Sequence, residues 1–214
     1  MSLAILVLHV CRTPFHRRAP GPPRLCGVQT PGHAVLNLAL LGGHASPALA
    51  VPILVGAVLP DVPIAVLYLR ERYVRGLSDE RIWSESYQRP FWLNLIHGAH
   101  SLPLSLLGGV VALALGVAPL AAFFASVFLH ALADFPLHVH DAHRHFLPFS
   151  QYRFISPISY WDVRYHGRAV ALGEALLVLG VSAWLWPRVP GAARAGLAAV
   201  TVWYAINYWK SFPR

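Results

Sequence analysis

Five long apolar runs, separated by short polar or charged connections, dominate the pattern of this chain. The runs are Pro47 to Leu69, Phe91 to Val117, Ala118 to Leu137, Ala169 to Trp186 and Gly191 to Tyr208. Each approaches the roughly 20 residues that a helix needs to cross a bilayer. A shorter apolar piece, His33 to Leu41, precedes them and predicts a re-entrant or tilted helix. The pattern predicts an all-α, polytopic integral membrane helical bundle with about five spans.

The composition agrees with a membrane protein. Of the 214 residues, 56% are apolar and 12% are charged, and the mean hydropathy is +0.51. A soluble domain typically carries about 25% charged residues. The formal net charge of +8 does not indicate a nucleic-acid partner, because Lys and Arg fall between the apolar runs and form no stripe along a helix.

The distribution of Lys and Arg predicts an orientation in the membrane. If the five runs alternate, one side holds residues 70–89, 138–168 and 209–214 with eleven Lys or Arg, and the other side holds Arg188 and Arg194. Cytoplasmic connections carry an excess of positive charge. The richer side, which also holds the polar ends of the second and third runs, is therefore predicted to face the cytosol.

Residues 1–29 are expected to stand apart from the rest of the chain. The apolar stretch Leu3 to Val10 precedes the Arg- and Pro-rich stretch Arg12 to Arg24, which reverses the order of a secretory signal peptide. We expect translation to begin near Val28. Residues 1–29 would then be an extension of a single membrane-embedded domain at 30–214.

Histidine and aspartate gather at the ends of the apolar runs. His130, Asp134 and His138 are four residues apart, so on a continuous helix they share one face with about 5–6 Å between neighbouring Cβ atoms. Burying ionisable groups in apolar segments costs several kcal/mol unless a partner neutralises them. A divalent cation is the simplest such partner. The predicted metal ligands are His33, Asp61, His97, His100, His130 and Asp134.

The type of ligand narrows the choice of metal. The only two cysteines, Cys11 and Cys26, lie in the N-terminal extension, so a thiolate site is not expected. Imidazole and carboxylate ligands favour zinc, with manganese or iron as alternatives. For isolated histidines such as His44 and His166, a hydrogen-bonded packing role is the stronger expectation.

Further polar residues follow the third apolar run directly. His138, His140 and Asp141 are predicted as catalytic residues, acting as general acid and base. Two other roles are open for the same side chains: additional metal ligands, or partners that orient the ligating imidazoles.

Four short motifs occur in order along the chain. They are Thr30-Pro-Gly-His33, Gly56-Ala-Val-Leu-Pro-Asp61, His97-Gly-Ala-His100-Ser101 and His130-Ala-Leu-Ala-Asp134. From about Thr30 to Arg168 the chain resembles the family described as LexA-binding, inner-membrane-associated hydrolases. That resemblance implies a metal-dependent hydrolase in a bacterial inner membrane. The family commonly has a second acidic residue after the Pro-Asp pair, whereas Val62 follows Asp61 here, so this motif offers one acidic ligand.

A divalent cation polarises a phosphoryl or carbonyl oxygen, which makes hydrolysis feasible without a nucleophilic side chain. The predicted function is therefore a membrane-bound, metal-dependent hydrolase with a cytosol-facing site. Its substrate would be a phosphoester or lipid-linked compound that arrives from the surrounding membrane lipids. Two alternatives are a metal transporter or sensor, and a non-catalytic membrane scaffold with a structural metal.

Overall fold

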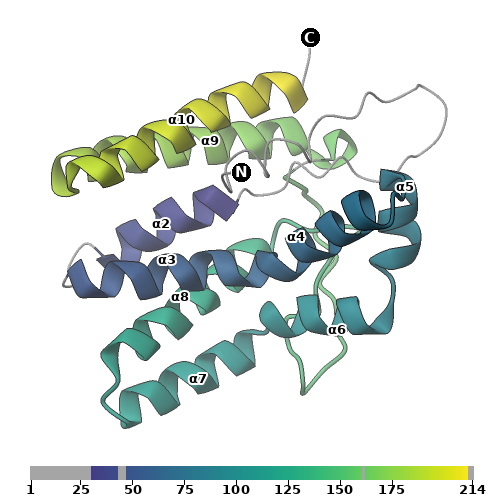
Figure 1. The fold of residues 1–214 in the computed structure, drawn as a ribbon, viewed down its shortest axis with the longest axis horizontal. Helices are drawn as coiled ribbons and strands as arrows, with labels where there is room; N and C mark the ends of the chain where they lie inside the picture. The colour runs from purple at the N-terminus through teal and green to yellow at the C-terminus, as the bar shows by residue number, and fades with distance from the viewer. Residues whose placement is uncertain (1–29, 43–46, 161, 212–214) are drawn as a thin grey trace.

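The computed structural model describes residues 30–42, 47–160 and 162–211 (Figure 1). Every regular element in these residues is helical, which confirms the predicted all-α class. The expectations for residues 1–29 and for His44 lie outside the described residues. In chain order the elements are α2 (Thr30–Gly42), η1 (Pro47–Leu49), α3 (Ala50–Val58), η2 (Leu59–Asp61), α4 (Val62–Leu69), η3 (Arg70–Val74), α5 (Asp79–Arg81), η4 (Ile82–Ser86), α6 (Pro90–Ala99), α7 (Leu102–Ala114), α8 (Ala118–Asp134), η5 (Val163–Tyr165), α9 (Gly167–Leu185), η6 (Trp186–Arg188) and α10 (Gly191–Ser211).

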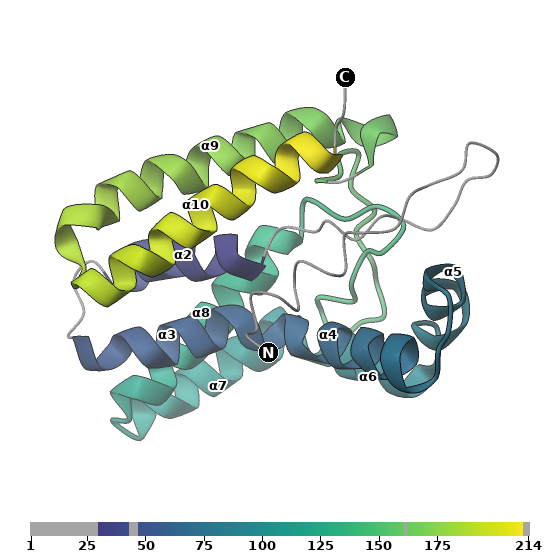
Figure 2. The ribbon, with the colours of Figure 1, turned by 45° about the horizontal axis from the view of Figure 1, so that its top comes forward.

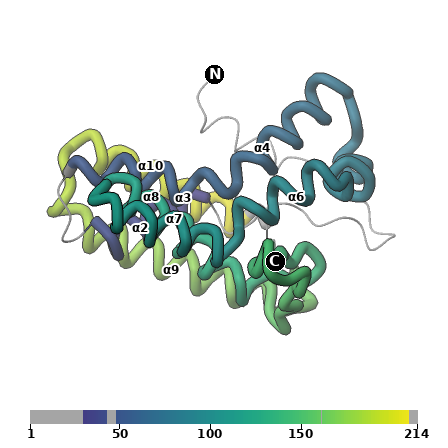
Figure 3. The backbone as a smooth tube through the Cα atoms, turned by 90° about the horizontal axis from the view of Figure 1, so that it is seen from below, coloured from purple at the N-terminus to yellow at the C-terminus, as the bar shows by residue number. Residues whose placement is uncertain are grey.

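The helices form an elongated bundle with an extension at one end. α8 packs against both α3 and α7, and α2 packs against α3 and α8. α9 and α10 form an antiparallel hairpin that covers α2 (Figures 1 and 2). α4 and α6 pack on each other and leave the bundle on the side away from the α9–α10 turn (Figure 3). The two parts therefore join where α3 continues into α4 and where α6 meets α7.

Helices α2, α3 and α8 are held together by close packing and by buried polar contacts. A Cβ atom added to Gly56 would lie 2.3 Å from the backbone oxygen of Phe123, so only glycine permits this approach of α3 to α8. Ser126 donates to the carbonyl of Ile53 at 2.6 Å and accepts from Asn37 at 2.9 Å. These contacts set how far each of the three helices is shifted along its axis relative to the others.

Two helix breaks occur at the junction between the bundle and its extension. Pro60 has no N–H to donate to the preceding turn, and there the chain tightens from α3 into the 3-10 turn η2. α6 and α7 meet at an angle of 49°. Ser101 caps α7, because its hydroxyl accepts from the backbone N–H of Leu104 at 3.2 Å. Both breaks turn neighbouring side chains toward the end of α8.

The irregular segment 135–160 returns along this junction. The carbonyl of His145 accepts from the backbone N–H of Leu102 at 2.9 Å, which ties the segment to the start of α7. Further along, the N–H of Ser156 donates to the carbonyl of His138 at 3.0 Å. The segment is thus fastened beside the C-terminal end of α8.

The number of membrane spans differs from the prediction. Among the described residues, Ala50–Val74 and Gly167–Arg188 are helical runs long and apolar enough to cross a membrane. A third candidate exists if the bent pair of α6 and α7 is counted as one span. The expectation of five spans is therefore wrong.

Helices α8 and α10 account for the difference. α8 ends at Asp134 after 17 residues, which at 1.5 Å per residue is about 25 Å, shorter than the roughly 30 Å of a hydrocarbon core. α10 is longer, but polar residues such as Arg194 and Asn207 interrupt its apolar sequence, and it is not a candidate span. The predicted orientation assigned the connections to two sides by alternating five spans, so that assignment no longer holds.

Candidate metal centre

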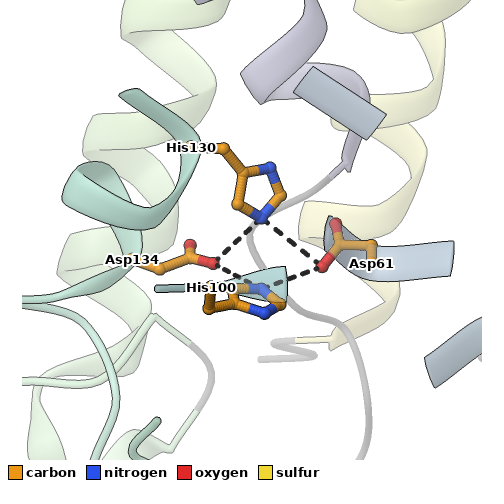
Figure 4. Close-up of side chains that lie close together, drawn as sticks. All are labelled: Asp61, His100, His130 and Asp134. Carbon is orange, nitrogen blue, oxygen red and sulfur yellow. Dashed lines mark ion pairs between the residues drawn. The ribbon is translucent and has the colours of Figure 1, made fainter. Parts of the chain in front are cut away.

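Two carboxylates and two imidazoles face one another where the helix breaks meet α8 (Figure 4). Asp61 ends η2, His100 directly follows α6, and two further residues, His130 and Asp134, lie one turn apart on α8. Nε2 of His130 is 3.2 Å from Oδ2 of Asp134 and 3.6 Å from Oδ1 of Asp61. Nε2 of His100 is 3.5 Å and 3.7 Å from the same two oxygens. We call these residues the four-ligand cluster.

Backbone carbonyls determine which nitrogen of each histidine faces the carboxylates. Nδ1 of His130 donates to the carbonyl of Ala57 at 2.7 Å, because a carbonyl oxygen can only accept. Nδ1 of His100 donates to the carbonyl of Ile96 at 2.8 Å in the same way. In a neutral imidazole the other nitrogen, Nε2, then carries the lone pair. Neither Nε2 atom has a hydrogen-bond partner among the described residues.

A hydroxyl from α2 orients the remaining ligand. Thr30 donates from Oγ1 to Oδ2 of Asp61 at 2.5 Å, which leaves Oδ1 turned toward the histidines. The side chain of Asp61 is 23% exposed, whereas those of His130 and Asp134 are 0% and 5% exposed. Solvent therefore reaches the four-ligand cluster at Asp61.

The donor set fits a divalent cation. The four ligand atoms all lie within 4.8 Å of one another. A negatively charged carboxylate oxygen repels the lone pair of an imidazole nitrogen that faces it. Burial makes this repulsion costly unless a positive charge lies between the two atoms. Nitrogen and oxygen ligands without sulfur suit zinc, manganese or iron. The protein thus contains a buried His/Asp cluster that could bind a metal ion.

A second group of ligand atoms adjoins the other oxygen of Asp134. Oδ1 of Asp134 is 3.1 Å from Nε2 of His33 and 3.8 Å from Nε2 of His138. Asp134, His138 and His143 each offer a ligand atom within 4.8 Å of the other two. We call these three residues the loop cluster, because two of them lie in the segment after α8. Asp141 lies beside the loop cluster, with Oδ2 3.0 Å from Nδ1 of His138.

The histidines near the loop cluster differ in charge. Burial opposes the charged form of His138, but the carboxylates of Asp141 and Asp134 outweigh burial and raise the pKa of His138 to about 10. Burial and neighbouring imidazoles hold the pKa of His143 well below its ordinary value. Burial also lowers the pKa of His145 to about 4. At neutral pH, therefore, His143 and His145 are neutral, which is the form that binds a cation.

The remaining predicted metal ligands lie beside these clusters. His33 contacts Asp134 and stacks on His130, with 3.9 Å between the ring centroids. His97 lies next to the loop cluster, where its Nδ1 is 3.4 Å from Nδ1 of His143. The structure therefore gathers all six predicted ligands in one region, four of them in the four-ligand cluster.

The three residues predicted as catalytic are separated in the structure. His138 and Asp141 adjoin Asp134, as described above. His140 is exposed, and its ring lies 5.6 Å from that of Tyr165 between centroids. It belongs to neither cluster.

Two buried histidines were absent from the predicted ligand and catalytic sets. His143 and His145 are each 2% exposed. They lie in an irregular segment, where no helical spacing relates them to Asp134. The only signal in the sequence was the density of histidine between His138 and His145.

A cationic side chain borders the same region. The backbone N–H of Arg144 donates to Nδ1 of His97 at 3.4 Å. Its guanidinium donates to two neutral oxygens, Oε1 of Gln151 at 2.6 Å and Oδ1 of Asn94 at 2.9 Å. Burial and the nearby charge of Arg153 lower the pKa of Arg144. Among the described residues no carboxylate forms an ion pair with Arg144, so its charge is available to an anion.

Comparisons with known proteins were negative: no family model, curated protein or solved structure matches this chain. The action of the two clusters must therefore be inferred from their own geometry.

Proposed function

We propose that this protein is a membrane-embedded, metal-dependent hydrolase whose metal ion is bound by the four-ligand cluster. The observation that carries the proposal is the arrangement of the two imidazoles. His100 and His130 each donate Nδ1–H to a backbone carbonyl, and each directs an unpartnered Nε2 at the same two carboxylates. Metal-binding histidines are typically oriented by such a hydrogen bond from the nitrogen that does not bind the metal.

Zinc is the proposed metal. Zinc binds nitrogen and oxygen at about 2.0–2.2 Å in a tetrahedron, so neighbouring ligand atoms are about 3.3–3.6 Å apart. The nitrogen-to-oxygen distances in the four-ligand cluster run from 3.2 Å, between His130 and Asp134, to 3.7 Å, between His100 and Asp61. These four nitrogen-to-oxygen distances are close to those of a zinc site.

The chain's own residues supply the rest of the chemistry. A bound divalent ion supplies Lewis-acid polarisation of the scissile ester or phosphoryl group. Asp61 marks the open side of the cluster, where a substrate would enter. His138, whose Nδ1 lies 3.0 Å from Oδ2 of Asp141, adjoins Asp134 and borders the site beside the metal position.

We propose an anionic phosphoester, carried on a lipid, as the substrate class. Arg144 lies beside the histidines and donates only to neutral oxygens among the described residues. A guanidinium binds a phosphate through paired hydrogen bonds. The cluster also lies at the breaks in two candidate membrane-spanning units, so a lipid-linked substrate could reach it from the bilayer.

We further propose a bacterial inner-membrane location, a cytosol-facing site and membership of the family described as LexA-binding, inner-membrane-associated hydrolases. The four ordered motifs support the family, and one residue from each motif, His33, Asp61, His100 and Asp134, lies in a single region. The orientation does not depend on five alternating spans: the Arg-rich residues 70–89 and 138–160 lie near each other beside α6 (Figure 1), and their surplus of positive charge supports a cytosolic side.

A structural metal in a non-catalytic scaffold is the second candidate. The complete burial of His100 and His130 favours it, because structural sites are closed to solvent. The partial exposure of Asp61 favours catalysis instead.

A hydrolysis assay distinguishes these candidates. Detergent-purified, zinc-loaded protein would be assayed with a phosphatidic-acid phosphomonoester, a lipid phosphodiester and a carboxylic ester. We expect turnover of a phosphoester, and a loss of more than about 100-fold in Asp134→Asn, because ligand loss should exceed the effect of outer-shell changes. His166→Asn is the matched control, since His166 is exposed and asparagine tolerates its φ of 62°.

The contrary result would be equally informative. Stoichiometric zinc in a protein that hydrolyses none of the three compounds would reject the hydrolase and leave the scaffold.

A further inference from the structure

We propose that Asp134 bridges two divalent cations: one in the four-ligand cluster and a second bound by Asp134, His138 and His143. The proposal rests on the proposed function and adds a second metal ion to the same site. The second ion would be held by the loop cluster, in which His143 belongs to none of the predicted ligand sets.

The two oxygens of Asp134 face different partners. Oδ2 lies 3.2 Å from His130 and 3.5 Å from His100. Oδ1 lies 3.1 Å from His33 and 3.8 Å from His138. A carboxylate that presents each oxygen to a separate set of imidazoles has the geometry of a bridging ligand.

His138 is oriented as a ligand would be. Oδ2 of Asp141 lies 3.0 Å from Nδ1 of His138, so the other nitrogen, Nε2, is the one turned toward Oδ1 of Asp134. This succession of carboxylate, histidine and metal position is common in metalloproteins, where the outer carboxylate fixes the orientation of the imidazole. Asp141 then acts as a positioning residue.

His143 connects the two clusters. Its side chain is 2% exposed, and its ring stacks on that of His100 with 4.2 Å between centroids. The ring of His138 lies 4.7 Å away by the same measure. So many buried imidazoles in contact cannot all carry a proton, and a divalent cation in the loop cluster would take the place of the proton on His138.

The charges point to a phosphoester as the ligand of the pair. Asp61, Asp134 and Asp141 carry a combined formal charge of −3. Two divalent ions would bring +4, which leaves a net positive charge at the site. Two-metal sites bind both the attacking and the leaving oxygen of a phosphoryl group. A phosphate group therefore complements the proposed pair better than a neutral ester does.

Metal stoichiometry tests the proposal. Full-length protein in detergent would be saturated with zinc, freed of excess metal and measured by inductively coupled plasma mass spectrometry. We expect two equivalents in the wild type, one in His138→Ala and two in the control His166→Asn. One equivalent in the wild type, or an equal content in wild type and His138→Ala, would overturn the second site.

A second measurement needs no variant. Manganese would be added to metal-free wild-type protein and followed by electron paramagnetic resonance. Carboxylate-bridged ions are magnetically coupled, so the six-line spectrum at one equivalent should give way to a coupled spectrum at two. A six-line spectrum that only doubles in intensity would exclude a bridge.

These outcomes separate this proposal from the hydrolase itself. One bound zinc together with phosphoester hydrolysis would reject the second ion and keep the proposed function. Two coupled ions without any hydrolysis would keep the second ion and reject the proposed function.

Discussion

At the scale of single residues, the proposed metal site depends on the hydrogen bonds that each histidine makes with its other ring nitrogen. The carbonyls of Ala57 and Ile96 hold the Nδ1–H groups of His130 and His100. Both carbonyls belong to helices whose regular bonding ends nearby, at Pro60 and at Ser101. The carbonyl of Ile96 also accepts from the backbone N–H of His100 at 3.2 Å, so it serves both the helix and the imidazole. Backbone carbonyls near the helix ends thus direct both Nε2 atoms toward the carboxylates.

Thr30→Val tests the orientation of Asp61. The substitution keeps the shape of the side chain but removes the hydroxyl that donates to Oδ2 at 2.5 Å. We expect zinc affinity to fall by about 10- to 100-fold, the usual effect of removing an outer-shell partner. Competition with a chromophoric chelator measures the affinity. Thr201→Val, the same change on α10, should leave it unchanged, and equal affinities in both variants would count against the assigned role.

The sequence predicted the site residues that lie in a helix or beside a proline, because helical spacing and helix breaks follow known rules. Four-residue spacing related His130 to Asp134, and Pro60 marked the break beside Asp61. No such rule applies after Asp134, where the chain is irregular. The spacing alone therefore could not show that His143 turns inward and that His140 turns outward.

At the scale of elements, the close packing of α3 against α8 positions the ligands. Asp61 follows α3 and His130 lies on α8, so any separation of these helices widens the four-ligand cluster. Within the apolar run Phe91 to Val117, Pro103 is the residue that could have indicated the bend between α6 and α7. That bend places His100 inside the site rather than at the end of a straight span.

Gly56→Ala should destabilise the protein. The added Cβ would meet the carbonyl of Phe123 at 2.3 Å, and such overpacking typically costs about 1–3 kcal/mol. Gly180→Ala on α9 meets nothing within 4 Å and should be neutral or stabilising by up to about 1 kcal/mol. Thermal unfolding in detergent compares the two. A similar melting temperature for both variants would show that α3 and α8 can separate without cost.

The turn before α9 should show a pH-dependent stability. Hydrogen bonds from Arg164, at 2.6 Å and 3.0 Å, lower the pKa of Asp162 from its ordinary value of about 3.9. The folded-state pKa lies below the unfolded one, so the charge stabilises the fold above about pH 4, and this contribution is lost as the pH falls through the folded-state pKa.

Asp162→Asn isolates that charge, because asparagine also caps helical turns. We expect a small decrease in melting temperature at pH 7, since Arg164 is 59% exposed. The difference from the wild type should shrink below pH 4. A difference that stays constant with pH would attribute the effect to packing.

At the scale of the whole molecule, the apolar surface indicates where lipid contacts the protein. Within the helical run Gly167–Arg188, only 17% of the most apolar 18-residue stretch is buried inside the protein. Leu176, Leu179 and Trp184 on α9 are among its exposed apolar side chains. By contrast, the part of the extension that follows α4, residues 70–89, contains many Arg, Asp and Glu residues. The bundle, together with α4, which continues the candidate span from α3, is therefore the part suited to a bilayer.

The lengths of the apolar runs overestimated the number of membrane spans, because a run can continue past the end of its helix. The apolar run from Ala118 stops being helical at Asp134, and the run from Phe91 bends near His100. In both cases the interruption is a residue of the site. A proline follows each interruption, Pro136 after α8 and Pro103 at the start of α7, and proline ends helices that the hydrophobic pattern alone would extend.

Quenching by brominated lipids tests this placement. In variants that retain a single tryptophan, we expect Trp184, which is 46% exposed on α9, to be quenched by lipids brominated in the acyl chains. Trp83, which is 9% exposed in the extension, should be quenched much less. Equal quenching of the two would argue against the bundle as the membrane-embedded part.

The central claim is that the four-ligand cluster binds a metal ion, and metal content tests it most directly. Detergent-purified wild type would be compared with a His100→Ala/His130→Ala double variant of equal helicity and with His166→Asn. We expect at least one equivalent of zinc, manganese or iron in the wild type and the control, and a loss of at least one equivalent in the double variant. A wild type that binds none of these metals when they are supplied would contradict the account.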